Sequence, residues 1–85
     1  MSKTVFTGAH KHLVRVLKDA RKKSGLKQEE LAERLGRERT MISLIETGQR
    51  RVDVLEFYAI AKALGLDPTE LFDELSDKLP DRIEI

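Results

Sequence analysis

The charged side chains of this 85-residue sequence are unevenly distributed, and they give the first indication of its chemistry. Residues 1–51 hold 13 Lys and Arg against six Asp and Glu, whereas residues 52–85 hold three against nine. The net charge of +1 conceals this division. A basic half favours an anionic partner such as nucleic acid; two solvated surfaces of opposite charge are the alternative.

A second group of candidate residues lies between residues 39 and 51. At 100° per residue, a helix in this region places Met41, Ile45 and Glu46 around Ile42. The opposite face then carries four residues: Thr40, Ser43, Leu44 and Thr47. Three of these are hydroxyl residues, which can donate and accept hydrogen bonds. Arginines flank the segment at positions 39, 50 and 51, so hydrogen-bonding and anion-binding groups are concentrated here.

No motif typical of catalysis or of metal binding is present. The sequence has no cysteine, and His10 and His12 have no paired carboxylate at ligand spacing. It contains neither a glycine-rich phosphate loop nor a motif that places a nucleophile. Adjacent acids such as Glu29 and Glu30 are typical of a solvated helix face. We therefore expect no enzymatic activity, no cofactor and no metal.

The elements that must position these side chains are helices. Apolar residues recur every three or four positions, and Leu, Ala, Glu, Lys and Arg dominate the composition. The spacing predicts an all-α chain that forms a five-helix compact bundle. Three helices are expected over His10–Ser24, Gln28–Leu35 and Arg39–Thr47, and two more after Asp53 and Asp67.

The predicted ends of these helices follow from capping residues. Asp53 with Glu56, and Asp67 with Glu70, have the spacing of capping boxes. Glycines at positions 25, 36, 48 and 65 end the first four helices, and Pro80 ends the fifth. The predicted domain spans residues 10–79, with tails over residues 1–9 and 80–85.

The second and third predicted helices, joined by a glycine turn, form a helix-turn-helix. Ala32 is small enough for the two helices to cross closely, and Gly36 permits the positive φ of the turn. Three stretches, LKQEELAERLG, ISLIETGQRR and IAKALGLDPTELF, occur in order between Leu26 and Phe72. In these stretches the sequence resembles the Cro/repressor, or Xre-type, family. The resemblance implies the phage-repressor-like DNA-binding fold with its helix-turn-helix.

The resemblance also implies residue roles. The base-reading positions of the recognition helix, about residues 39–47, correspond to Arg39, Thr40, Ser43 and Leu44. Contacts to the DNA backbone are implied for Lys27, Gln28, Thr47, Gln49, Arg50 and Arg51. A structural ion pair is implied between Arg21 and Glu46.

Four positions depart from the family pattern. Lys27 and Glu38 stand where Ser or Thr usually caps the second and third helices, which costs about 1 kcal/mol per helix. Arg37 replaces a usual small apolar residue in the turn, and Leu44 replaces a usual polar residue. The fold prediction does not depend on these positions, whereas the base contacts do.

The resemblance implies a small transcriptional regulator, a repressor in the first instance, that binds double-stranded DNA. Apolar residues beyond the needs of one core, together with an acidic second half, predict a homodimer on a short palindrome, with recognition helices roughly 34 Å apart. Within this class a phage-type repressor, a restriction-modification controller and an antitoxin are all open. The alternative class is a protein-interaction module or antitoxin-type partner-binding protein. Because no membrane span or signal segment is recognisable, we expect no membrane partner and a cytoplasmic location.

Overall fold

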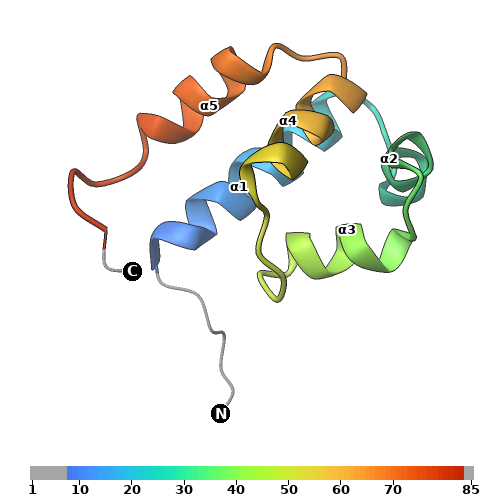
Figure 1. The fold of residues 1–85 in the computed structure, drawn as a ribbon, viewed down its shortest axis with the longest axis horizontal. Helices are drawn as coiled ribbons and strands as arrows, with labels where there is room; N and C mark the ends of the chain where they lie inside the picture. Colours follow the sequence, from blue (N-terminus) through green and yellow to red (C-terminus); the bar gives the residue numbers. More distant parts are fainter. Residues whose placement is uncertain (1–7, 84–85) are drawn as a thin grey trace.

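The computed structural model describes residues 8–83, which form five α-helices and no strand (Figure 1). The helices are α1 (Gly8–Lys23), α2 (Gln28–Leu35), α3 (Arg39–Glu46), α4 (Val54–Ala63) and α5 (Pro68–Ser76). The predicted all-α, five-helix fold is confirmed. Helix α1 begins two residues before its predicted start, and residues 1–7 and 84–85 of the predicted tails lie outside the described residues.

The turn between α2 and α3 depends on Gly36, which has a φ of 68°. Its N–H donates to the carbonyl of Glu33, and the next N–H, of Arg37, donates to the carbonyl of Ala32. These two bonds satisfy the last carbonyls of α2. A side chain at position 36 would be strained in this left-handed backbone, so glycine sets the angle at which α3 leaves α2.

The helix N-termini are capped in two ways. At α4, the Glu56 N–H donates to Asp53 Oδ1 over 2.7 Å and the Asp53 N–H donates to Glu56 Oε1 over 3.0 Å, which confirms the predicted capping box. At α5, Asp67 accepts from the Thr69 N–H over 2.9 Å, one position before the one expected of a box with Glu70. Either N–H satisfies the helix end, so Asp67 is still the cap.

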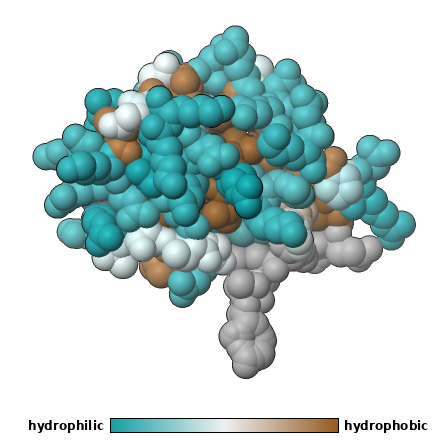
Figure 2. All heavy atoms as spheres, turned by 180° about the vertical axis from the view of Figure 1, so that it is seen from behind, coloured by the Kyte–Doolittle hydropathy of each residue, from teal (hydrophilic) through white to brown (hydrophobic). Residues whose placement is uncertain are grey.

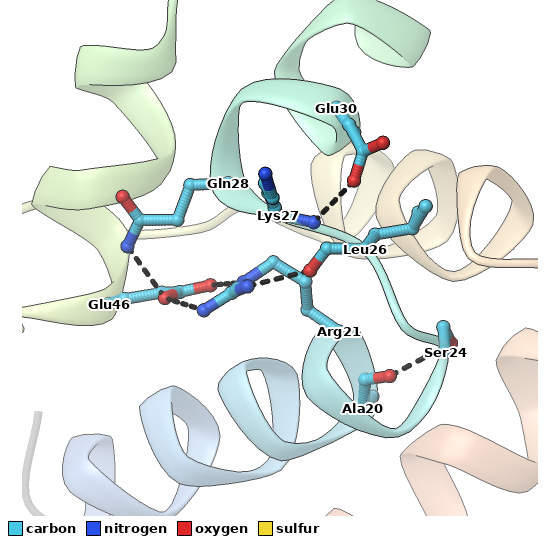
Figure 3. Close-up of polar contacts among 8 residues, drawn as sticks. All are labelled: Ala20, Arg21, Ser24, Leu26, Lys27, Gln28, Glu30 and Glu46. Carbon is cyan, nitrogen blue, oxygen red and sulfur yellow. Dashed lines mark hydrogen bonds and ion pairs between the residues drawn. The ribbon is translucent and has the colours of Figure 1, made fainter.

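The departure at Lys27 is partly compensated. A lysine side chain has no acceptor, but the carboxylate of Glu30 reaches back and accepts the Lys27 N–H over 2.8 Å (Figure 3). Glu38, at the start of α3, makes no side-chain cap.

The core lies where α1 packs against α3 and α5 and where α4 packs against α2 and α5. It contains thirteen buried apolar residues: Val16, Leu17, Ala20, Leu31, Ala32, Met41, Ile42, Ile45, Ile60, Ala61, Leu64, Leu71 and Leu75. Ala32 and Ala61 are almost inaccessible, as close helix crossings require. On α1, Val16 is buried, whereas Val14 is only half-buried.

Phe72 on α5 is 53% exposed, although most of the other apolar side chains of that helix are buried. Its ring meets that of Phe57 edge to face, with the centroids 6.0 Å apart. Among residues 8–83, no helix is long and apolar enough to cross a membrane.

Candidate nucleic-acid interface

Helix α3 has one buried and one exposed side, and it lies at the edge of the molecule (Figure 1). Met41, Ile42, Ile45 and Glu46 are buried, with Ile42 only 1% exposed. The predicted rotation of this helix is therefore confirmed. Because the buried residues attach α3 to the core, the opposite side is free to meet a partner.

The exposed side of α3 carries the residues singled out from the sequence. Arg39, Thr40, Leu44 and Thr47 are exposed, and Ser43 is half-buried. Leu44 is 36% exposed and is not part of the core. The structure thus brings these side chains to one surface, a row of hydroxyls with one guanidinium and one apolar group.

The buried end of α3 is held by Arg21 and Glu46, which are only 9% and 4% exposed at their side chains (Figure 3). Arg21 Nε donates to Glu46 Oε2 over 2.7 Å, and its Nη2 donates to Oε1 over 2.9 Å. Its Nη1 donates to the Leu26 carbonyl over 2.7 Å. One guanidinium therefore joins α1, the loop before α2, and the last turn of α3.

Gln28 completes this network. Its Nε2 donates to Glu46 Oε1 over 2.9 Å, so the first residue of α2 is tied to the last residue of α3 (Figure 3). The sequence singled out Gln28 for a phosphate contact but gave no indication of this bond. The bond fixes the orientation of the two helices of the helix-turn-helix relative to each other.

The segment after α3 is ordered by its own polar groups. Thr47 Oγ1 donates to the Ser43 carbonyl over 2.9 Å, and Gln49 Nε2 donates to Thr47 Oγ1 over the same distance. The N–H of Gln49 also donates to the Leu44 carbonyl. Thr47 and Gln49 are both exposed, so they form a fixed polar corner at the end of the exposed face of α3.

Arg50 is engaged within the protein. Its Nη2 donates to Glu56 Oε2 over 2.9 Å, its Nη1 donates to Glu56 Oε1 over 3.1 Å, and Nη1 also donates to the Arg51 carbonyl. This two-point pairing closes the turn between α3 and α4. The bond from Arg50, with a smaller contribution from the backbone of Asp53, lowers the pKa of Glu56 to about 2.

We predict that this pair makes stability depend on pH. Glu56 has a folded pKa of about 2 against an ordinary 4.5, so its contribution is complete above about pH 5 and is lost as the pH falls toward 2. Since both side chains are partly exposed, we expect the pair to contribute about 1 kcal/mol to the free energy of unfolding. The unfolding temperatures of the protein and of Glu56→Gln should converge as the pH falls through this range. If Glu56→Gln had the same pH profile of stability as the unchanged protein, the pair would not cause the pH dependence.

The remaining cations lie at the margins of this surface. Lys27 is exposed at the start of α2, and Arg51 is exposed after the turn. Partial burial, and then the charge of Arg51, lowers the pKa of His10. Arg51 therefore lies near the first turn of α1. No group of three or more His, Asp or Glu among residues 8–83 is arranged to hold a metal ion.

Two contributions to this surface were not found from the sequence. Glu56 was assigned only a capping role, and Gln28 only a phosphate role. In hindsight, the available signal for Glu56 was its position in the first turn of a helix that follows two arginines by a short loop. For Gln28 no local signal exists, because its partner is 18 positions away in the sequence.

The sequence and the structure both have relatives among known proteins. The helix-turn-helix family matches residues 17–71. Control protein C.BamHI of Bacillus amyloliquefaciens is 45% identical over 51 residues, which are 60% of this chain and 63% of that protein. A helix-turn-helix-type transcriptional regulator of Methanothermobacter thermautotrophicus is 40% identical over 55 residues, which are 65% of this chain and 80% of the relative.

Two solved structures show the same architecture. An XRE-family-like protein from Pseudomonas syringae superposes with a TM-score of 0.78 at 38% identity, over 85% of this chain and 88% of the other. The restriction-modification controller protein C.Esp1396I superposes with a TM-score of 0.77 at 28% identity, over 85% and 94%. Family match, sequence relatives and architecture agree: the chain belongs to the Xre-type helix-turn-helix family of DNA-binding transcriptional regulators.

Proposed function

We propose that the chain is a small repressor, without catalytic activity, that binds a short palindromic DNA operator as a homodimer. Helix α3 enters the major groove, which is wide enough for one helix. The observation that carries this proposal is the orientation of α3: its apolar side is buried in the core while Arg39, Thr40, Ser43 and Leu44 share the outer side.

The residues around α3 supply the contacts that fix its position on DNA. Lys27 and Gln28 stand at the N-terminus of α2, where helix N–H groups favour a phosphate. One N–H of the Gln28 amide bonds Glu46, and the other serves a phosphate oxygen. Thr47, Gln49 and Arg51 contact the next phosphates of the DNA backbone. Arg50 has its guanidinium on Glu56 and therefore shapes this turn as well as adding charge.

The base contacts are expected to be separable. Leu44 would contact a thymine methyl and Arg39 a guanine edge. We expect Leu44→Ala to relax the preference at one A·T position by around 1 kcal/mol, and Arg39→Ala to relax a different, G-containing position by ~1–3 kcal/mol. Binding to a panel of single-position operator variants measures both. Because Leu44 lies outside the core, the thermal stability of Leu44→Ala should be close to that of the unchanged protein. A loss of ~2–3 kcal/mol in the free energy of unfolding would place Leu44 in the core.

A different outcome is expected at Arg51. A phosphate contact carries no sequence information, so Arg51→Ala should weaken binding about equally for all duplexes and lower the salt slope by roughly 1. Titrations of two unrelated duplexes across a salt series measure the slope. A changed base preference with an unchanged slope would contradict the phosphate role.

The homodimer is supported by apolar side chains on α4 and α5. Val54 and Leu55 are 82% and 77% exposed, and Tyr58 is 54% exposed. Val54 also borders a groove of about 390 Å³ between α1, α4 and α5. The groove is lined by Leu13, Val52, Asp53, Val54, Phe57, Phe72 and Leu75. Exposed apolar area of this kind marks a protein interface, and a two-fold dimer would use it on both copies.

The names of the relatives favour one kind of regulator over the others. Two of them are named as control or controller proteins, and one of these as a restriction-modification controller. We infer a controller-type regulator in preference to a phage repressor or an antitoxin. In vitro selection of bound duplexes is the decisive experiment, and we expect two half-sites related by two-fold symmetry. No enrichment at low salt would instead support the protein-interaction module.

A further inference from the structure

Helix α1 carries a row of cations on the side that faces away from the core. Lys11, Arg15, Lys18 and Lys22 follow one another at spacings of four, three and four, which keeps them within about 60° of arc. The buried residues of α1 lie on the opposite side. We call these four residues the basic stripe.

Helix α5 carries the opposite charge in a similar arrangement. Its acidic stripe consists of Glu70, Asp73, Glu74 and Asp77, which share about 100° of arc and are all exposed. Phe72, which borders the apolar groove, lies on the other side of the helix. The acidic stripe is therefore separate from the surface proposed for the homodimer.

The two stripes lie on neighbouring helices but do not neutralise each other. Helices α1 and α5 pack side by side, yet among residues 8–83 the ion pairs involve Arg21 with Glu46 and Arg50 with Glu56, and no stripe residue. Helix α1 lies behind α4 in Figure 1 and so faces the viewer in Figure 2, where hydrophilic residues cover most of the surface.

Parts of both stripes are unfavourable for the helices that carry them, although Lys22 in the last turn of α1 and Glu70 in the first turn of α5 are favourably placed. Like charges four positions apart repel, and a helix favours anions at its N-terminus and cations at its C-terminus. Lys11 stands in the first turn of α1, which has no acidic residue. Asp73, Glu74 and Asp77 stand at the C-terminal end of α5, whose last turn has no basic residue. Such placement calls for a partner of opposite charge.

We propose that the partner is a second copy of this chain, with the basic stripe of each molecule against the acidic stripe of the other. This reciprocal contact satisfies both stripes at once. DNA would satisfy only the basic stripe and would leave the acidic stripe, on the helix packed beside α1, without a counter-charge. The contact joins DNA-binding dimers to one another and is separate from the dimer itself.

The test is a charge swap. One variant, Lys11→Glu/Arg15→Glu, reverses part of the basic stripe, and another, Asp73→Lys/Asp77→Lys, reverses part of the acidic stripe. Lys11→Glu places an acid in the first turn of α1 and Asp73→Lys places a cation in the last turn of α5, as these helices favour, and all four side chains are exposed, so neither variant should unfold. Glu29→Lys/Glu33→Lys, on the exposed side of α2, changes the charge by as much as the second variant and is the control.

Sedimentation velocity at about 20 mM and about 300 mM salt measures association in the absence of DNA. We expect species larger than the dimer at low salt only, weakened at least ten-fold in each stripe variant, unchanged in the control, and restored when the two stripe variants are mixed. Absence of the larger species, or failure of the mixture to restore it, would overturn the proposal. Duplex binding and the dimer at high salt test the proposed function separately, so the two failures are distinguishable.

If the basic stripe instead binds DNA, a different pattern is expected. Lys11→Glu/Arg15→Glu would then lose duplex affinity, Asp73→Lys/Asp77→Lys would not, and mixing would restore nothing. That result would also overturn the proposed contact.

Discussion

Glu46→Ala is expected to destabilise the protein by ~3–5 kcal/mol, a large part of the total stability of a domain of this size. The substitution leaves the guanidinium of Arg21 buried without its counter-charge and removes the acceptor of Gln28. Thermal unfolding by circular dichroism measures the effect, and each kcal/mol corresponds to about 4–8 °C.

Two matched variants separate the causes. Gln28→Ala removes one bond to the same carboxylate and should cost only about 1–2 kcal/mol. Arg21→Met/Glu46→Leu replaces both charges by apolar groups of similar volume and should recover most of the loss, because the penalty comes from the unpaired charge. If Glu46→Ala cost less than 1 kcal/mol, the pair would not hold α3 in place.

The second large effect is expected at the exposed start of α4. Val54→Asp/Leu55→Asp should give a monomer and lower operator affinity by at least about 100-fold, because a dimer engages its second half-site at high effective concentration. The carboxylates would have to be buried without a partner in the interface. Light scattering measures the mass, and a duplex titration measures the affinity.

The same variant should fold normally. Positions 54 and 55 are the first two of α4, where negative charge is favourable, and both side chains are largely exposed in the single molecule. Thr69→Asp, at the second position of α5, adds a carboxylate at a similar helix end and should leave mass and affinity unchanged. A monomeric protein before mutation, with full operator affinity, would contradict the proposed homodimer.

Much of the fold could be predicted from the sequence because its signals are local. The spacing of Leu31 with Ala32, and of Ile42 with Ile45, fixes which side of α2 and α3 is buried. Glycine at position 36 fixes where α2 ends, and the capping box of Asp53 fixes where α4 begins. Such signals act within about four residues, so they are readable without knowledge of the tertiary structure.

The polar partners were decided by the tertiary structure. The sequence contains sixteen Lys and Arg and fifteen Asp and Glu, and nothing in their spacing says that Arg50 pairs with Glu56 or that Gln28 bonds Glu46. The exposure of Phe72 and the burial of Val16 were likewise decided by the tertiary structure, since they depend on which neighbouring helices cover α5 and α1.

The sequence by itself thus determined the five helices, the helix-turn-helix and the outward face of α3, since these follow from periodicity and caps. Only the tertiary structure decided which polar groups form bonds within the protein and which remain on its surface for a partner. Distances and burial set the strength of a hydrogen bond or an ion pair, and both arise when helices distant in sequence pack together.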